Sequence, residues 1–296
     1  MNENISPCDL NEVKDFLFLH IAAVSSPDGM QWLKEKCTHT LSQKEFYLAF
    51  SAAPRFVGKE KLRCNEVALQ KTFSLRKGWN PLLYTADRAA RIILLLSHVH
   101  ETTATFLKTV RTLLSSADSS EQVAIYSSLA LLPFPEEFVL LAAEGVRSNM
   151  RDVFDAIALE NPFPADFFSE NAWNQMVLKA IFINRPLFRM YDIDARVNPS
   201  LAATLIDYVH ERRAANRTIT PELWRCVVPF VDEKNIADIQ KLALSTDPLE
   251  RKAATLVCSQ SNFPEVKKIL HDLCSEMAVN SLSWDSIGKE FTSLNQ

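Results

Sequence analysis

The stretch of sequence that decides the fold is residues 161–225, which read NPFPADFFSENAWNQMVLKAIFINRPLFRMYDIDARVNPSLAATLIDYVHERRAANRTITPELWR. Apolar residues recur in it at spacings of three and four, the period of one face of an α-helix. The pattern is clearest from Trp173 to Ala180, where the remaining positions are also mostly apolar. It predicts a helix over residues 171–183 that is packed between neighbours.

This helix also carries polar side chains, among them Asn174 and Lys179. A polar group that is buried without a hydrogen-bond partner costs about 1–3 kcal/mol. These side chains therefore either find partners within the protein or face a wet cavity. Both interpretations remain open at this point.

Asn198 and the proline after it predict the start of the next helix, since Asn is a strong N-cap and Pro fits the first helical position. The helix is expected over 201–213, and its last turns are charged. Two interpretations fit that charge: the cations complement the negative end of the helix dipole, or they form an anion-binding edge. The charged residues of this end are His210, Glu211, Arg212, Arg213 and, just beyond the helix, Arg217.

A further helix is expected over 222–231, because Thr220 and Pro221 offer a cap and a first helical residue. It places Trp224 and Arg225 within reach of the charged helix end. The sequence thus brings two tryptophans and several cations onto consecutive helices.

The composition is that of a globular helical protein. Of 296 residues, 47% are hydrophobic and 23% are charged, which is enough apolar material for a sizeable core. Five glycines against fourteen prolines disfavour β-rich and nucleotide-binding folds, because these need glycine for turns and phosphate loops. A net charge of −4, without an obvious Lys/Arg-rich tract, argues against nucleic acid as a partner.

The six cysteines are scattered and never form C-x-x-C, so neither a zinc site nor a redox pair is indicated. The first residues are acidic, whereas a signal peptide begins with basic ones. The longest apolar runs fall short of the ~18 residues that span a bilayer. We expect a soluble, cytoplasmic protein with reduced thiols that needs neither a metal nor a cofactor.

Cap signals divide the rest of the chain into helices. Ser42 and Glu45 form a capping box at the start of a helix that is expected to end at Pro54. Near the C-terminal end, DPLERKAATLVCSQSNFPEVKKILHDL, from Asp247, resembles a HEAT-type repeat. The predicted fold class is all-α: a HEAT-like α-α superhelical array of antiparallel helix pairs.

The least helical segment is residues 76–84, which contain Gly78 and Pro81. We therefore expect an N-terminal helical segment over 1–84 and the HEAT-like array over 85–296. Because no long polar linker separates them, the two parts are expected to form one continuous structural unit.

Catalytic motifs are not recognisable. Asp192 and Asp194 could offer oxygen ligands to Mg²⁺, but Arg196 follows closely enough to neutralise one carboxylate, which favours a structural loop. His210 and Glu211 lack the second His of a helical zinc site, and no nucleophile elbow or phosphate loop occurs. The sequence names no catalytic residue.

Three segments together are similar to the EboA family, the metabolite-traffic proteins encoded in bacterial ebo clusters. The similarity extends over about residues 40 to 260, and the family differs by an aromatic residue at Arg213 and a Gly at Asn216. The segments are FYLAFSAAPRFVGKEKL (46–62), ENPFPADFFSENAWNQMVLKAIF (160–182) and DYVHERRAANRTITPELWR (207–225).

The resemblance implies a non-catalytic binding or scaffold protein that assists the traffic of a secondary-metabolite precursor towards or across the inner membrane. The partners it implies are that precursor and other ebo-cluster proteins, including a UbiA-type membrane prenyltransferase. Peripheral attachment to the inner membrane follows from the same comparison. These expectations agree with a helical chain that has no catalytic signature.

Two alternatives remain open. A cryptic enzyme could act on the precursor with Asp194, His210 and Glu211 as acid/base groups and Arg212 or Arg225 fixing an anion. A purely protein-binding helical adaptor would grip partners on a concave surface. The predicted ligand-binding surface consists of Trp173, Asn174, Lys179, Asp194, Arg196, His210, Glu211, Arg212, Trp224 and Arg225.

Overall fold

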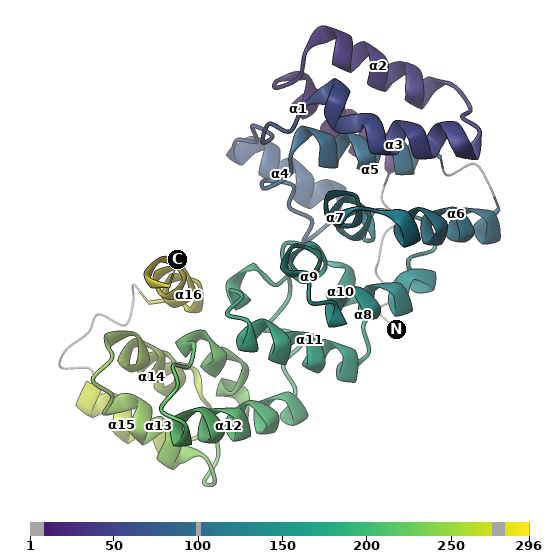
Figure 1. Cartoon of the computed structure of the whole chain (residues 1–296). Helices are drawn as coiled ribbons and strands as arrows, with labels where there is room; N and C mark the ends of the chain where they lie inside the picture. Colours follow the sequence, from purple (N-terminus) through teal and green to yellow (C-terminus); the bar gives the residue numbers. More distant parts are fainter. Residues whose placement is uncertain (1–8, 99–101, 274–281, 296) are drawn as a thin grey trace. The chain divides into compact units, whose positions relative to one another are not determined.

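The regular secondary structure of the protein is helical, as the sequence predicts. A computed structural model describes residues 9–98, 102–273 and 282–295 (Figure 1). Within these ranges, extended pairing is limited to an isolated bridge between Lys61 and Thr85. No helix in them is long and apolar enough to cross a membrane. The prediction of an all-α fold is confirmed.

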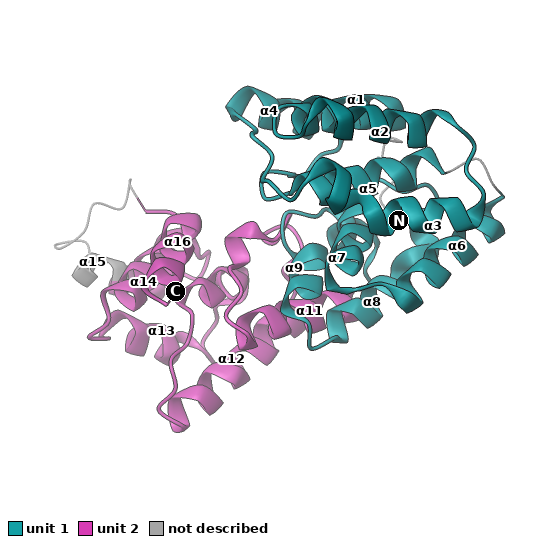
Figure 2. Ribbon diagram, turned by 45° about the horizontal axis from the view of Figure 1, so that its top comes forward, with its two compact units in different colours: residues 1–169 teal, residues 170–296 magenta. Residues whose placement is uncertain are grey.

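The chain divides into two compact units, residues 1–169 and 170–296, which Figure 2 shows in different colours. The non-helical segment 76–84 lies inside the first unit, where the backbone N–H of Leu62 donates to the carbonyl of Tyr84 at 2.9 Å. The helices of the first unit are α1 Leu10–Ala22, α2 Pro27–Thr38, α3 Gln43–Val57, α4 Glu66–Leu75, α5 Ala86–Ser97, α6 Thr103–Ser116, α7 Ser119–Ser128, the 3₁₀ turn η1 Pro135–Phe138, α8 Val139–Arg147, α9 Arg151–Ala158 and α10 Phe163–Phe167.

Helix α5 is the centre of the first unit. It packs against α1, α2, α3 and α7, and all of its residues except Arg88 and Ser97 are buried. The burial includes a charged pair, because Arg91 Nη1 donates to Asp87 Oδ2 at 2.7 Å one turn away. A buried pair of this kind contributes little net stability, but losing one partner leaves an uncompensated charge in the core.

Arg91 also supplies a hydrogen-bond donor that is missing from α3. The sequence suggests that this helix ends at Pro54, and that expectation is wrong, because α3 continues through Pro54 to Val57. Proline has no N–H to give to the carbonyl four residues earlier, which is that of Phe50. Arg91 Nε takes this place and donates to Phe50 O at 3.0 Å. The helix therefore tolerates its internal proline because a neighbouring helix supplies the missing donor.

This geometry predicts energetic coupling between Pro54 and Arg91. Arg91→Met should cost about 3–5 kcal/mol, since it leaves Asp87 buried without its partner. In a Pro54→Ala background the cost should be about 1–2 kcal/mol smaller, because the substituted alanine gives Phe50 O an intrahelical donor. Urea unfolding of the four proteins of a double-mutant cycle measures the difference. Asp87→Asn is the control and should show no coupling to Pro54→Ala; equal coupling for both pairs would contradict the interpretation.

The second unit is built on α14. Its apolar face is buried against α13, α15, α16 and the 3₁₀ turns. The elements of this unit are α11 Glu170–Phe182, η2 Leu187–Arg189, α12 Pro199–Ala214, η3 Pro221–Cys226, η4 Val228–Phe230, α13 Ile236–Ala243, α14 Pro248–Gln260, α15 Val266–Leu273 and α16 Trp284–Leu294.

Two features of the second unit differ from the sequence-based expectation. Residues 222–231 are expected to form an α-helix, but two short 3₁₀ turns, Pro221–Cys226 and Val228–Phe230, occupy this stretch. Pro229 has no N–H to donate within an α-helix, and its ring would clash with the preceding turn of one. Thr220 accordingly makes no side-chain cap. Helix α16 is not among the expected helices, and it contributes Asp285 to the ion cluster around Arg225.

Candidate functional site

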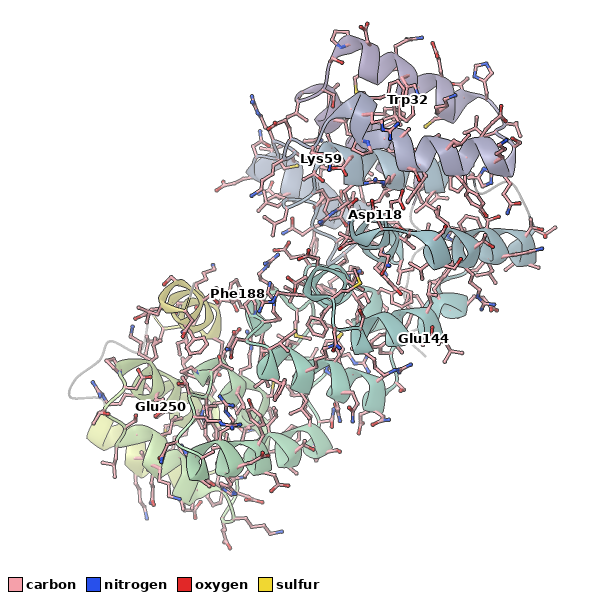
Figure 3. The ribbon with its side chains drawn as sticks, viewed as in Figure 1. Trp32, Lys59, Asp118, Glu144, Phe188 and Glu250 are labelled. Atoms are coloured by element: carbon pink, nitrogen blue, oxygen red, sulfur yellow. The ribbon has the colours of Figure 1, made fainter. Side chains whose placement is uncertain are left out.

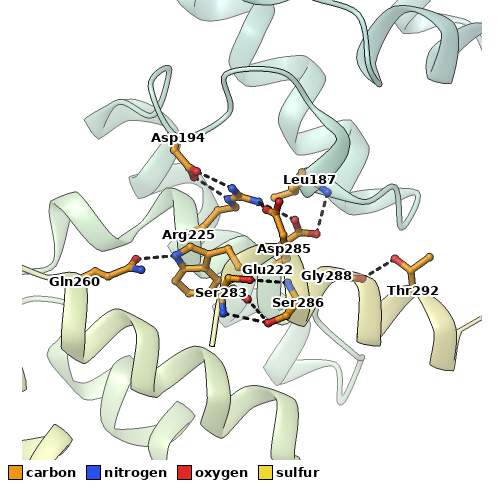
Figure 4. A network of polar contacts seen from close by, with 11 residues as sticks. Leu187, Asp194, Glu222, Arg225, Gln260, Ser283, Asp285, Ser286, Gly288 and Thr292 are labelled. Atoms are coloured by element: carbon orange, nitrogen blue, oxygen red, sulfur yellow. Dashed lines mark hydrogen bonds and ion pairs between the residues drawn. The ribbon is translucent and has the colours of Figure 1, made fainter. Parts of the chain in front are cut away.

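Arg225 is the centre of a buried ion cluster in the second unit (Figure 4). Its Nε and Nη2 donate to the two oxygens of Asp194 at 2.7 and 2.6 Å, a bidentate pair. Its Nη1 donates to Glu222 at 3.0 Å and to Asp285 at 3.3 Å. Burial acts to lower the pKa of Arg225, but the hydrogen bonds and charge of Asp194, with the charges of the other two carboxylates, outweigh it and raise the pKa. Three carboxylates thus surround one cation.

Glu222 is the most deeply buried member of this cluster, with 2% of its surface exposed. Its second carboxylate oxygen accepts the backbone N–H of Leu187 at 2.9 Å, which ties η3 to η2. Burial raises the pKa of Glu222 to about 7, although Arg225 and the backbone donors of η2 act in the opposite direction. Near neutral pH this carboxyl group is therefore divided between its protonated and ionised forms.

Helix α16 covers Glu222. A Cβ atom at Gly288 would lie 2.6 Å from the Glu222 carboxyl group and 2.7 Å from the ring of Phe188, so only glycine allows this approach. Trp284, at the start of α16, donates from Nε1 to Gln260 Oε1 at 2.8 Å and fixes the helix on α14. Among the described residues of the cluster, Asp194 and Asp285 have exposed side chains, at 61% and 53%.

A second set of contacts joins α11 to the start of α12. The side-chain amides of Asn174 and Asn198 bond reciprocally at 3.1 and 2.8 Å, and Asn198 caps α12 by accepting from Leu201 N at 2.9 Å. The guanidinium of Arg196 lies 4.8 Å above the centre of the Trp173 ring. Trp173 is 1% exposed, and its Nε1 has no hydrogen-bond partner among the described residues.

The charged end of α12 faces α13 and η3. His210 Nε2 lies 2.8 Å from Asp238 Oδ2, and Arg213 Nη1 donates to Asp238 Oδ1 at 3.0 Å. The Arg213 guanidinium also lies 5.8 Å from the centre of the buried Trp224 ring. Trp224 is thus within reach of this helix end, as expected, but its ring is covered by Arg213 rather than offered to solvent.

The remaining predicted residues lie on α11 and near the end of α12. Arg212 donates from Nε and Nη2 to the carbonyl of Thr218 at 3.2 and 2.7 Å and lies over Tyr208, where it closes the turn after α12. Glu211 is exposed. Lys179 is half-buried on α11, and burial lowers its pKa.

The structure therefore divides the predicted surface into three places: the Arg225 cluster with Asp194, the Trp173 contacts with Asn174 and Arg196, and the α12 end with His210, Arg212 and Trp224. Sequence reasoning missed Glu222 as the carboxylate at i−3 from Arg225, a spacing it could have used. It also missed Asp238, Asp285 and Gly288. Asp238 has no local signal, whereas Trp284, Ile287 and Phe291 recur at the spacing of a helix face and could have revealed α16.

Chemically, the Arg225 cluster is an ion network rather than an open anion site. Four of the five N–H donors of Arg225 point to carboxylates, so these bonds leave one N–H for any further acceptor. No group of three or more His, Cys, Asp or Glu in the described part of the chain is placed to hold a metal ion.

Comparison with known proteins identifies the family. Residues 13–228 match the family model described as metabolite traffic protein EboA. The chain belongs to the EboA family. Searches of curated proteins and of solved structures returned no significant match. The EboA match includes Asp194, Glu222 and Arg225, whereas Asp285 lies beyond it.

The turn after α12 contains a residue in a left-handed backbone conformation. Asn216 follows α12 with φ of 52°, in the left-handed region that glycine enters at least cost. Asn tolerates this region better than most other residues do. The turn after α12 can therefore form with Asn at position 216.

The two arginines of the predicted site should respond differently to removal. Arg225→Ala should lower the free energy of unfolding by about 3–5 kcal/mol, because it leaves Glu222 buried without its partner. Arg212→Ala should cost less than about 1 kcal/mol, since it removes hydrogen bonds to an exposed turn. Chemical denaturation at pH 7 compares them directly. If both substitutions lowered the free energy of unfolding by the same small amount, the ion pairs of Arg225 would not be important for stability.

The raised pKa of Glu222 predicts a pH dependence of stability. A carboxyl group whose pKa is about 7 in the folded protein and 4.5 in the unfolded chain holds its proton more tightly when folded. Its contribution to stability therefore falls as pH rises from about 4.5 to 7 and is constant above that range. Gln cannot titrate but keeps an acceptor for Leu187 N–H. The stability of Glu222→Gln relative to wild type should rise across this window by on the order of 3 kcal/mol.

Denaturation curves recorded between pH 5 and pH 8 measure this difference. Asp285→Asn is a matched control, because its carboxylate is half exposed and also pairs with Arg225. Its difference from wild type should change much less over the same range. A Glu222→Gln difference that does not vary with pH would contradict the assignment.

Proposed function

We propose that the chain is a non-catalytic binding protein that assists the traffic of a secondary-metabolite precursor towards or across the inner membrane. Its membership of the EboA family supports the metabolite-traffic role. The geometry supports binding rather than catalysis, because Asp194 and Arg225, which a catalytic site would need free, are engaged with each other. The other partners we propose are ebo-cluster proteins, including a UbiA-type membrane prenyltransferase.

The observation that carries the binding proposal is the Nε1–H of Trp173. This buried donor finds no acceptor among the described residues, and an unmet donor costs about 1–3 kcal/mol. Because this nitrogen is closed to solvent in the free protein, a carbonyl or carboxylate oxygen of a ligand would reach it only after the side chains around it move, and the guanidinium of Arg196 lies over the ring face nearby. Proteins usually pair their buried donors, so an unpaired one at a candidate site favours a ligand that completes it.

The experiment that tests this function starts from the host cell. The tagged protein is purified from its own host, and mass spectrometry identifies the proteins and small molecules that accompany it. A small molecule recovered in this way and added at about 100 times its dissociation constant should stabilise the protein by roughly 2.7 kcal/mol. If proteins are recovered but no small molecule stabilises the chain, the purely protein-binding adaptor is favoured instead.

Trp173→Phe and Trp79→Phe form a matched pair for the role of the indole donor. Both tryptophans are buried, but Trp79 Nε1 donates to Tyr84 Oη at 3.2 Å, whereas the Trp173 donor is unmet among the described residues. Trp79→Phe should therefore be more destabilising in the free protein by about 1–2 kcal/mol. Only Trp173→Phe should abolish stabilisation by the recovered small molecule. Thermal melts with and without that molecule test both statements, and retention of the shift in Trp173→Phe would refute the assigned contact.

A cryptic enzyme acting on the precursor is the second candidate, and the contact between His210 and Asp238 favours it. A buried carboxylate that holds a half-exposed imidazole is an arrangement that orients a general base. Asp194 and Glu211, the other acid/base candidates, do not belong to this pair. Conversion of the recovered precursor by the wild-type protein, lost in His210→Gln, would establish this alternative.

The stacking of the helix pairs bears on how such a binding protein would meet its partners. We propose that the antiparallel helix pairs stack as a HEAT-like superhelical array, which would give a scaffold an extended surface for partners. The succession of α14 and α15 after Asp247, joined by a short turn, supports this arrangement.

A further inference from the structure

The first unit carries a helix that contributes almost nothing to its core. Among the ten residues of α4, only Thr72 is buried. Figures 1 and 2 both place α4 at the margin of this unit. Large apolar side chains remain exposed on it and just after it: Val67 at 72%, Phe73 at 55%, and Leu82 and Leu83 at about two fifths each. Burial within the unit does not explain these side chains.

Residues 59–83, which we call the α4 excursion, comprise α4 and the two segments that connect it to the core, and the ends of this range lie side by side. The N–H of Leu62 donates to Tyr84 O at 2.9 Å, and the N–H of Ala86 donates to Glu60 O at 2.8 Å, so the two ends are joined by backbone bonds. The returning arm is anchored by Arg76, which donates to the carbonyl of Ala130 at 3.1 Å and pairs with Asp166. The two ends of the excursion are therefore fixed to the first unit, whereas most of the surface of α4 faces solvent.

The exposed charge of the α4 excursion is strongly positive. Five of its cations are exposed and have no ion pair among the described residues, whereas its exposed anions are Glu60 and Glu66. This imbalance stands out in a chain whose net charge is −4. Because the cations are spread over several turns, the sequence shows no obvious basic tract. The five are Lys59, labelled in Figure 3, Lys61, Arg63, Lys71 and Lys77.

We propose that the α4 excursion binds the surface of an anionic lipid bilayer. Exposed Val, Leu and Phe side chains beside Lys and Arg suit the interface of a membrane, where apolar groups enter the acyl boundary and cations meet the headgroups. Nucleic acid would use the cations but not the aliphatic side chains. The inference rests on the proposed traffic function for its biological role and names the surface that meets the membrane.

Vesicle co-sedimentation of the full chain tests the proposal, without any metabolite. Wild type should bind vesicles of an equal mixture of phosphatidylcholine and phosphatidylglycerol and should bind pure phosphatidylcholine much more weakly. Each Lys near an anionic surface contributes about a fivefold gain, so Lys59→Ser with Lys61→Ser should weaken binding about 30-fold. Lys44→Ser with Lys108→Ser, which changes two exposed lysines of the same unit outside the excursion, should have little effect.

The apolar side chains are tested in the same assay. Phe73→Ser should weaken binding several-fold, whereas Leu140→Ser, which changes another exposed apolar residue of the first unit, should not. Absence of binding to the mixed vesicles, or equal effects of the two lysine pairs, would overturn the proposal. Binding to an acidic protein or to RNA but not to the vesicles would overturn it as well. Lysine variants that lose vesicle binding but keep stabilisation by the recovered small molecule separate this surface from the metabolite site.

Discussion

The second unit depends on the constraint that one buried guanidinium must satisfy three carboxylates. Arg225 joins the loop before α12, η3 and α16, and through Glu222 it also holds η2. The 3₁₀ turns η2 and η3 would not be stable alone, because 3₁₀ turns have few internal hydrogen bonds and their geometry is poorer than that of an α-helix. Their positions follow from the fixed fork of Arg donors, which meets Asp194 in the bidentate arrangement that gives geometric specificity.

The first unit solves a related problem in the same way. Proline removes a backbone donor wherever it enters a helix, and this chain has 14 prolines. At Pro54 the unmet acceptor is the carbonyl of Phe50, and Arg91 supplies the donor from α5. Arg76 similarly reaches the carbonyl of Ala130 beyond the end of α7. Buried arginines thus stabilise places where helices are broken or strained, each paired with a carboxylate that compensates its charge.

The sequence predicts features of the fold that depend on neighbouring residues. The capping box of Ser42 and the Asn198 cap are found as expected, because a cap is a contact over three residues. The sequence does not predict that α3 passes through Pro54, since the compensating donor lies in another helix. Likewise it places Arg225 at a site but not its partner Asp285, which comes from a helix 60 residues further along the chain. Partners of buried charges are long-range properties that a local pattern does not contain.

Helix α16 lies outside the range of the EboA family match. The match ends at residue 228, three residues after Arg225, so the cluster is formed from a family segment and a helix beyond it. Glu222 owes its raised pKa mainly to burial, and the contact of Gly288 with its carboxyl group contributes to that burial. The protonation of Glu222, which lies inside the matched range, is therefore controlled in part by a helix outside that range. If another segment covered the carboxyl group of Glu222, its burial would change and its pKa would change with it. The net charge of the Glu222–Arg225 pair therefore depends on the element that covers it.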